Sequence, residues 1–486
     1  MGKSIVLFYL ILGVIRVNSQ PCSEYIQHKK DVRSSVLICP NAMAEDLSEL
    51  YQSIMKTHPD PYIYCSKEEL DSAYIEAKNA VLSAQNILDF SLVLTGFIKN
   101  IRDSHTYFNP RDLLVLAGNK SKSVPFYLKK IDSKFYLVKA YDNTIPVGVE
   151  VLKVGSMTVD SLYQLTRLFS PDEAFTESAR TEITIKMMGL VFNVHNKSLE
   201  NEVQFKYVNT LGDTLLKRIR RIKSKKLFKN EEWYPSKELE YHFLTDQAYL
   251  RVYSFESRNE KKFKKTIDRF FSLVDSKGIN SVIIDVRENR GGFILLLEHL
   301  LSYININDDT YDLNYAYKRS DLDRFESLSR LKKIDFVKKA KRVYPRGMIS
   351  KEYDFFLSPK GTVRTILYEK NLVNSRNNHY RGDCKLYMNG LSMSASVLLA
   401  SWFKETNRGE TVGTPCFGSL QATHGNPATI VLKNSGLPVS ISTLKLTPNH
   451  VMKNKYGDID IDKPVTFKLR DIQYGIDPFK SNGSRD

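Results

Sequence analysis

The sequence predicts an α/β core that is preceded by a helical module and a β-rich module. Strand and helix patterns alternate through residues 245–470, short β runs dominate residues 120–212, and apolar residues recur at helical spacing through residues 42–115. A chain of 486 residues is too long for one ordinary hydrophobic core, so two or three domains are expected. These three ranges are the predicted structural units.

The core prediction rests on strands, a helix and a glycine turn in succession. Residues 248–255 have a strand pattern, residues 261–276 have an amphipathic helix pattern, and residues 281–285 form an apolar run typical of a buried strand. Gly291 and Gly292 follow, just before an apolar helix. Backbone N–H groups in such a turn can face a ligand. The alternative is a tight turn whose glycines serve backbone geometry only.

A serine-rich turn follows a later strand of the predicted core. The strand covers residues 385–388, and Ser392, Ser394 and Ser396 lie at the start of an amphipathic helix over residues 395–406. Free N–H groups at a helix N-terminus stabilise negative charge, which would suit a nucleophile. The alternative is that these serines only cap the helix.

The helical module contains a clear helix start and ends in a polar turn. Ser66 is a good N-cap, and Glu69 three residues later completes the pattern of a capping box. The module ends in the segment IRDSHTYF, which contains His105.

The first 19 residues have the anatomy of a cleavable export signal. Lys3 precedes an apolar run over residues 5–15, and small residues precede the predicted cleavage after Ser19. The run is too short to span a bilayer comfortably, and an uncleaved anchor is the alternative. The sequence contains no second apolar run of spanning length. We therefore expect a secreted or periplasmic protein with no membrane span in the mature chain.

Charge and cysteine content narrow the expected partners. The net charge is +16, but Lys and Arg are scattered without a recognised nucleic-acid motif, so no nucleic-acid partner is expected. Binding to acidic substrates or to an anionic surface stays open. No Cys or His spacing suggests zinc, and we expect neither a metal nor an organic cofactor. The sequence carries no signal for the oligomeric state.

Five cysteines follow the export signal, which allows one or two disulfides and leaves at least one thiol over. Their spacing does not decide whether Cys384 and Cys416, which flank the serine-rich turn, form a pair.

Three segments together resemble the tail-specific (C-terminal-processing) serine peptidase family, and more closely its tricorn-like branch. SVIIDVRENRGG resembles the strand-plus-Gly-Gly signature of the family, and LYMNGLSMSASVLLASWFKETNRGETVGTPCFG resembles its nucleophile segment. IRDSHTYF resembles the Asp-x-His-Thr turn that supplies a catalytic His in the tricorn-like branch. The likeness covers about residues 47–465 and implies a PDZ-like module between a helical cap and a peptidase core.

The resemblance implies a role for each matching residue. Ser394 falls on the nucleophile position, and His105 falls on the general-base position. Ala395 would donate its N–H to the oxyanion, and either Gly291 or Gly292 would supply the second donor.

The chain departs from the bacterial Ser-Lys branch of the family. That branch has a Lys in an FGKG segment about 25 residues after the nucleophile, whereas residues 417–419 read FGS here. The resemblance therefore favours His105 as the base, with Ser104 as a residue that orients its ring.

A second departure concerns the acidic residue that holds the His. The tricorn-like branch typically uses a late Glu, but no Glu follows Glu410. The closing segment KYGDIDIDKPV offers Asp458, Asp460 and Asp462 instead. Asp462 aligns with a common structural Asp, so the resemblance leaves Asp458 as the orienting carboxylate.

Other polar residues near these segments are given structural roles. Asp285 and Arg287 are expected to organise the turn before the glycines. His299 is expected in the core or on a helix surface. We expect His424 to lie in a surface loop, with a base or a substrate contact as alternatives.

The sequence thus predicts a secreted serine endopeptidase that binds an extended polypeptide and forms an acyl-enzyme on Ser394. The main alternative is a catalytically impaired or inactive relative that acts as a peptide-binding protein. A basic surface-adhesion protein is a weaker third hypothesis.

Overall fold

The computed structural model describes the chain between residues 39 and 481, with internal gaps. The described residues are 39–116, 122–124, 126–140, 145–196, 201–223, 237–257, 259–306, 313–320, 358–368, 379–420, 422–448 and 457–481. The predicted export signal lies outside them. None of the helices in these ranges is long and apolar enough to cross a membrane.

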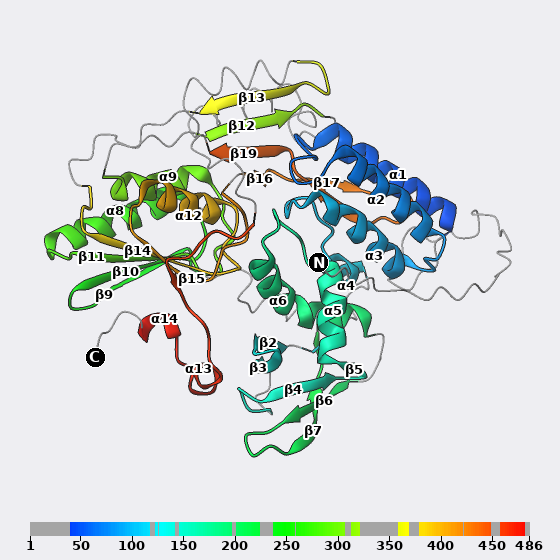
Figure 1. Cartoon of the computed structure of the whole chain (residues 1–486), viewed down its shortest axis with the longest axis horizontal. Coiled ribbons are helices and arrows are strands. Elements are labelled where there is room, and N and C mark those ends of the chain that lie inside the picture. Colours follow the sequence, from blue (N-terminus) through cyan, green and yellow to red (C-terminus); the bar gives the residue numbers. More distant parts are fainter. Residues whose placement is uncertain are drawn as a thin grey trace, which may run out of the picture.

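The core is a six-stranded, mostly parallel sheet with three helices on one face (Figure 1). Its strand order is β20-β15-β14-β11-β10-β9, and β9 is the one antiparallel edge strand among these six. The strands are β9 (Leu239–Phe243), β10 (Gln247–Val252), β11 (Ser281–Asp285), β14 (Asp383–Met388), β15 (Glu410–Gly413) and β20 (Lys463–Pro464). The covering helices are α8 (Glu260–Ser276), α9 (Ile294–Ile304) and α12 (Ala395–Thr406). The predicted α/β core is confirmed.

The apolar spacing of α8 explains how it covers the sheet. Phe263, Ile267, Phe270 and Val274 recur at intervals of three and four residues, and all four are buried against the strands. The short α13 (Leu469–Tyr474) and α14 (Pro478–Ser481) follow the last strand, and Phe479 of α14 packs on the opposite face of the sheet.

The N-terminal module is helical, as predicted. It consists of α1 (Pro40–Thr57), α2 (Lys67–Val81), α3 (Ile87–Ile98), the 3₁₀ turn η2 (Lys99–Ile101) and α4 (Arg111–Leu116). The capping box at the start of α2 is confirmed, because Ser66 Oγ accepts the Glu69 N–H while Glu69 accepts the Ser66 N–H at 2.7 Å.

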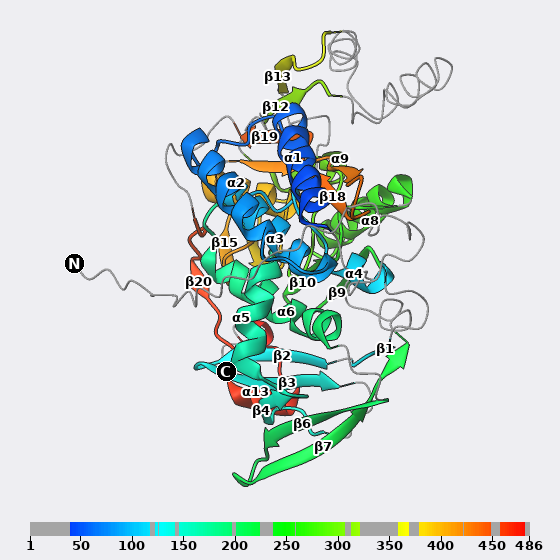
Figure 2. The same ribbon diagram turned by 90° about the vertical axis from the view of Figure 1, so that its right-hand side faces the viewer.

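A curled antiparallel sheet and two helices form the β-rich module, at the bottom of Figures 1 and 2. The strand order is β2-β3-β4-β6-β7, and β5 pairs with β4. The strands are β2 (Phe126–Ile131), β3 (Lys134–Ala140), β4 (Glu150–Val154), β5 (Met157–Thr158), β6 (Glu202–Val208) and β7 (Thr214–Arg220). The helices are α5 (Val159–Phe169) and α6 (Glu177–His195), and β1 (Lys122–Ser123) pairs with β8 (Ile222–Lys223). Its likeness to a PDZ domain stays a prediction.

Two further strand sets join the modules. β13 (Val363–Tyr368), β12 (Leu313–Lys318), β19 (Leu444–Pro448) and β16 (Thr423–Gly425) form one sheet, and β17 (Ala428–Val431) pairs with β18 (Pro438–Ile441) as the predicted hairpin. The hairpin packs into the helical module, since Ile430 and Val439 share its core with Leu47 and Leu50. Residues about 390 positions apart in the sequence are thus brought together.

The cysteines at the serine-rich turn do not pair. Cys384 and Cys416 are both free and buried, and Cys65 is free as well. Cys39 takes part in a disulfide.

A buried ionic cluster organises the turn that follows β11, as predicted for Asp285 and Arg287. Asp285 is fully buried and pairs with Arg251 and with Arg287, whose Nη2 lies 2.6 Å from Asp285 Oδ2. Arg287 also donates to Asp477 at 2.9 Å. Burial raises the pKa of Asp285, but the attraction of Arg251 and Arg287 outweighs it and leaves the pKa below its usual value.

We expect Asp285→Asn to lower the free energy of unfolding by about 3–5 kcal/mol, because it removes the buried anion of Arg251 and one of the two anions of Arg287. Asp477→Asn is the matched control, because the Asp477 side chain is 28% exposed and the substitution removes only one partner of Arg287. Urea unfolding of both variants measures the difference. Equal losses in the two variants would contradict this role of Asp285.

Candidate active site

Ser394 stands at the junction between the serine-rich turn and α12, in a backbone conformation that is rare for a residue with a side chain. Its φ is 52° and its ψ is −115°, which is outside the helical and extended regions. Such strain is held in place by the surrounding structure and is common at active sites. Ser394 is partly exposed and is the last residue of the turn before α12 begins.

The three serines of this turn have different surroundings. Ser392 Oγ donates to the carbonyl of Val286 at 2.8 Å, and Ser396 Oγ donates to the carbonyl of Asn289 at 3.1 Å. Both hydroxyls therefore tie the turn to the residues that follow β11. The hydroxyl of Ser394 makes no hydrogen bond within the described part of the chain, which leaves it available for chemistry.

The glycine turn lies directly against Ser394. Gly291 has a φ of +92°, and a Cβ added to it would lie 2.6 Å from Ser394 Cβ and 2.7 Å from the nitrogen of Ala395. A Cβ on Gly292 would lie 2.3 Å from the carbonyl carbon of Phe255. Close backbone approach thus requires glycine at both positions. The two residues therefore do serve the backbone geometry of the turn.

The two glycines differ in whether their N–H groups already have a hydrogen-bond partner. The N–H of Gly291 donates to Asn289 Oδ1 at 2.8 Å. The N–H groups of Gly292 and Ala395 donate to no other described residue. A developing oxyanion next to Ser394 can therefore draw on Ala395, at the start of α12, and on Gly292.

His105 is held by a tight turn that is docked on the C-terminal hairpin. Its backbone N–H donates to Asp103 Oδ1 at 2.9 Å. Two residues later, Tyr107 exchanges two backbone hydrogen bonds of 3.0 Å with Ser440 of β18. The side chain of His105 is 19% exposed, and its Nδ1 has no hydrogen-bond partner.

The carboxylates beside His105 are Asp103 and Glu173. Asp103 Oδ1 lies 3.6 Å from Nδ1 of His105. Glu173, in the loop between α5 and α6, accepts the backbone N–H of Ser104 at 2.7 Å. Burial lowers the pKa of His105, but the charges of Asp103 and Glu173 outweigh it and raise the pKa above its usual value.

Glu173 is fully buried, and this changes its acidity. Burial raises its pKa to about 8, and the negative charge of Asp103 adds to the effect. Nothing in the sequence around Glu173 indicates this position, since the contact depends on how the loop packs on the His105 turn.

Asp458, the orienting carboxylate implied by the resemblance, contacts a different part of the chain. It is exposed and accepts the N–H of Ser178, at the start of α6, at 3.4 Å. The described residues show no hydrogen bond or ion pair between Asp458 and His105. Asp462 has the expected structural role, because it accepts the N–H of Thr411 at 2.8 Å and pairs with Lys404.

His424 is not in a surface loop, and that prediction is wrong. It lies in β16 and is fully buried, because β16 is covered by the helical module instead of by solvent. Its Nδ1 lies 3.6 Å from Asp103 Oδ1, and burial lowers its pKa to about 3. His299 is on α9 as expected and contacts Asp268 at 2.8 Å.

His105 and the serine turn border the same cavity. Its volume is about 300 Å³, and Met393, the residue before Ser394, lies in its wall with His105. Most of the remaining wall is apolar and includes Phe108, Phe169, Ile183, Met187, Leu190 and Leu391. The structure thus places His105 and Met393, the residue before Ser394, in the wall of one largely apolar hollow.

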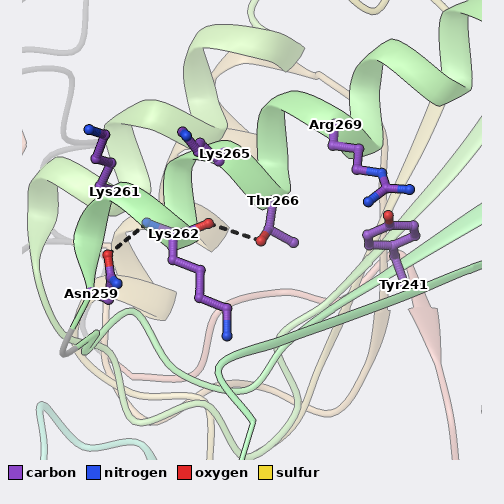
Figure 3. A pocket seen from close by; sticks show the side chains of 7 residues that line it. All are labelled: Tyr241, Asn259, Lys261, Lys262, Lys265, Thr266 and Arg269. Carbon is purple, nitrogen blue, oxygen red and sulfur yellow. Dashed lines mark hydrogen bonds between the residues drawn. The ribbon is translucent and has the colours of Figure 1, made fainter.

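A second hollow, of about 410 Å³, lies on α8 and β9 (Figure 3). Its cationic side chains are Lys261, Lys262, Lys265 and Arg269. It contains neither an acid nor a His, so it does not carry the chemistry described above.

The comparisons with known proteins agree with this site. Residues 246–462 match the model of peptidase family S41, and this segment contains the Gly291-Gly292 turn and Ser394. The core of the chain is thus similar to this family, which agrees with the resemblance to tail-specific peptidases. Its class is that of peptidases, which are hydrolases. No curated protein sequence matches the chain.

Solved structures resemble the whole fold. Mature CPAF in complex with lactacystin has a TM-score of 0.63 at 16% identity, over 91% of this chain and 97% of that chain. The photosystem II D1 C-terminal processing protease has a TM-score of 0.40 at 13% identity, covering 87% and 92%. The tricorn protease has a TM-score of 0.36 at 13% identity, covering 91% and 36%. The likeness to CPAF shows that the two chains share a fold.

We expect Gly291→Ala to lower the rate at which a serine-reactive phosphonate labels the protein by about 100-fold or more, because its Cβ would displace Ser394. Gly278→Ala is the matched control. It also has a positive φ, of 64°, but its Cβ would meet open space. Labelling rates that fall equally in both variants would show that backbone strain, and not contact with Ser394, is responsible.

Proposed function

We propose that the protein is an exported serine endopeptidase that cleaves extended polypeptides, with Ser394 as the nucleophile and His105 as the general base. The observation that carries this proposal is the free hydroxyl of Ser394 on a strained turn, pressed against a glycine turn that offers backbone N–H groups. The match of residues 246–462 to peptidase family S41 supports it. Export rests on the signal-like residues 1–19.

The reaction would proceed through an acyl-enzyme. Ser394 Oγ attacks the scissile carbonyl carbon while its proton passes to His105, and the carbonyl oxygen becomes an oxyanion that accepts the N–H groups of Ala395 and Gly292. The imidazolium then protonates the leaving amine as the C–N bond breaks. Water, deprotonated by His105, hydrolyses the ester and restores Ser394.

The substrate would enter through the cavity that His105 and Met393 share. Ser394 Oγ and His105 make no hydrogen bond in the described chain, and catalytic hydrogen bonds are often long before substrate binds. An apolar side chain of the substrate in this cavity, next to Phe108 and Leu391, would exclude water from the space between nucleophile and base.

We also propose that Asp103, joined by Glu173 at a pH above the pKa of about 8 of that carboxyl group, supplies the charge behind His105, in place of Asp458. Two contacts support this assignment. Asp103 accepts the backbone N–H of His105, and Glu173 accepts that of Ser104, the residue implied to orient the ring. Asp458 instead accepts the N–H of Ser178.

A direct test is hydrolysis of an unfolded protein substrate. We expect Ser394→Ala to lower kcat by at least about 10,000-fold, because it removes the group that forms the acyl-enzyme. Ser401→Ala is the matched control, since this buried hydroxyl lies on the same helix and has no hydrogen-bond partner. Equal hydrolysis by the wild type and Ser394→Ala would overturn the proposal. Substrate binding without hydrolysis by the wild type would favour the peptide-binding alternative.

The third catalytic partner is tested by Glu173→Gln beside Asp458→Asn, both assayed in the presence of a chelator. At a pH about one unit above the Glu173 pKa of about 8, where this carboxyl group is mostly ionised, we expect Glu173→Gln to lower kcat at least about tenfold with little change in KM, because the charge acts on the imidazolium of the transition state. Asp458→Asn is expected to leave kcat within about twofold, as for other surface substitutions. The reverse pattern would restore Asp458 as the orienting residue.

A further inference from the structure

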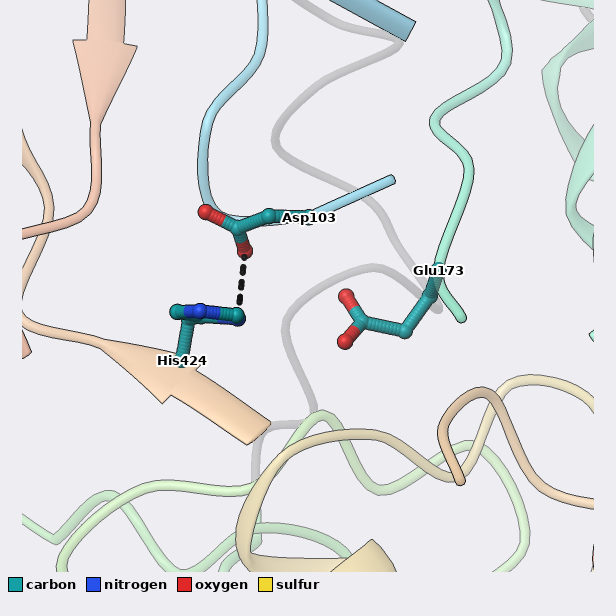
Figure 4. A group of neighbouring side chains, drawn as sticks. All are labelled: Asp103, Glu173 and His424. Carbon is teal, nitrogen blue, oxygen red and sulfur yellow. Dashed lines mark ion pairs between the residues drawn. The ribbon is translucent and has the colours of Figure 1, made fainter. Parts of the chain in front are cut away.

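Three acidic and imidazole side chains from distant parts of the chain meet beside the His105 turn (Figure 4). Asp103 follows η2, Glu173 lies between α5 and α6, and His424 lies in β16. One ligand atom from each residue lies within 4.8 Å of the other two, and the three residues are 3%, 1% and 0% exposed. Figure 4 shows the carboxylates of Asp103 and Glu173 directed toward the ring of His424.

The polar atoms of this cluster are not satisfied by the protein. Neither ring nitrogen of His424 has a hydrogen-bond partner, and Oε1 of Glu173 has none. Buried polar atoms without partners are rare and cost about 1–3 kcal/mol each. A polar species is therefore expected between these side chains.

Charge indicates which species this is. Two buried carboxylates repel each other unless a proton or a cation lies between them. Among the described residues, no Lys or Arg forms an ion pair with Asp103 or Glu173. The ion pairs of Asp103 are with the imidazoles of His58, His105 and His424.

The two oxygens of Asp103 are used differently. Oδ2 accepts from Thr106 Oγ1 at 2.7 Å and from the hydroxyl of Ser442, and it lies 3.0 Å from Nε2 of His58. These contacts fix the orientation of the carboxylate, as hydrogen bonds to metal-binding side chains commonly do. Oδ1 is turned toward His424, at 3.6 Å from its Nδ1.

That separation is longer than a hydrogen bond and suits two ligands of one ion. Zinc–nitrogen and zinc–oxygen bonds of about 2.0–2.2 Å at tetrahedral angles place neighbouring ligand atoms about 3.3–3.6 Å apart. Nδ1 of His105 also lies 3.6 Å from Asp103 Oδ1 and has no partner, so it is a candidate for the fourth position.

We propose that Asp103, Glu173 and His424 bind one divalent transition-metal ion of the Zn²⁺ class. A mixed set of imidazole nitrogen and carboxylate oxygens selects such ions over Mg²⁺ and Ca²⁺, which prefer oxygen ligands alone. The ion would join the helical module, the α5–α6 loop and β16 at the position from which His105 is oriented. This inference departs from the expectation that the protein takes no metal, and it does not depend on the peptidase activity.

The test uses the full mature chain with Ser394→Ala, so that proteolysis plays no part. After treatment with a chelator and dialysis, the protein is titrated with Zn²⁺ against a chromophoric competitor, and bound zinc is counted by mass spectrometry. We expect one ion per chain, and His424→Gln and Glu173→Gln should each weaken binding at least about 100-fold. His299→Gln is the matched control, because this ring contacts the carboxylate of Asp268 at 2.8 Å and is not part of the cluster.

Binding of well under one ion per chain, or equal binding by all four proteins, would overturn the proposal. Circular dichroism checks that the variants fold. If His424→Gln and Glu173→Gln do not fold, the Co²⁺ form of the parent decides. Visible absorption bands of a four-coordinate nitrogen and oxygen site support the proposal, and the spectrum of aqueous Co²⁺ overturns it.

Discussion

The candidate site depends on the contact between the glycine turn after β11 and the serine turn after β14. Gly291 lies so close to Ser394 and Ala395 that no side chain fits between them. The N–H of Met393 donates to the carbonyl of Asn289 at 2.8 Å, and Ser396 donates to the same carbonyl. Because β11 and β14 are adjacent parallel strands, their following turns meet at one sheet edge. This contact holds Ser394 in its strained conformation and places the nitrogen of Ala395 against the glycine turn.

His105, the proposed general base, is positioned by a different part of the fold. His105 belongs to the helical module, which reaches the core because the β17–β18 hairpin packs among its helices and pairs with Tyr107. Asp46 strengthens this docking, since its carboxylate accepts the N–H groups of Asn434 and Ser435 at 2.8 and 2.7 Å. The sheet thus positions Ser394, and a long-range packing contact positions His105. The polar cluster of Asp103, Glu173 and His424 lies where these two parts meet.

Local patterns in the sequence predicted much of this structure. The helix expected over residues 395–406 is α12, and the strand expected over residues 281–285 is β11, because each has an apolar period that matches its final burial. The resemblance selected Ser394 from three serines, and the hydrogen bonds of Ser392 and Ser396 give the physical reason.

The surroundings of His105 could not be predicted in this way. Glu173 sits in an irregular loop, and His424 sits in a strand of only three residues. Neither position has a periodic or capping signal, because both are defined by contacts across the fold and not along the chain. The resemblance points to Asp458 by its place in the chain order, and chain order carries no information about contacts across the fold.

The central claim is that Ser394 alone among the serines of its turn is an activated nucleophile. The most direct measurement is peptide mapping by mass spectrometry after reaction of the wild-type protein with a serine-reactive phosphonate. The account predicts one adduct, on Ser394, which disappears when His105 is replaced by Ala. An adduct on another serine, or no adduct on folded protein, would contradict it.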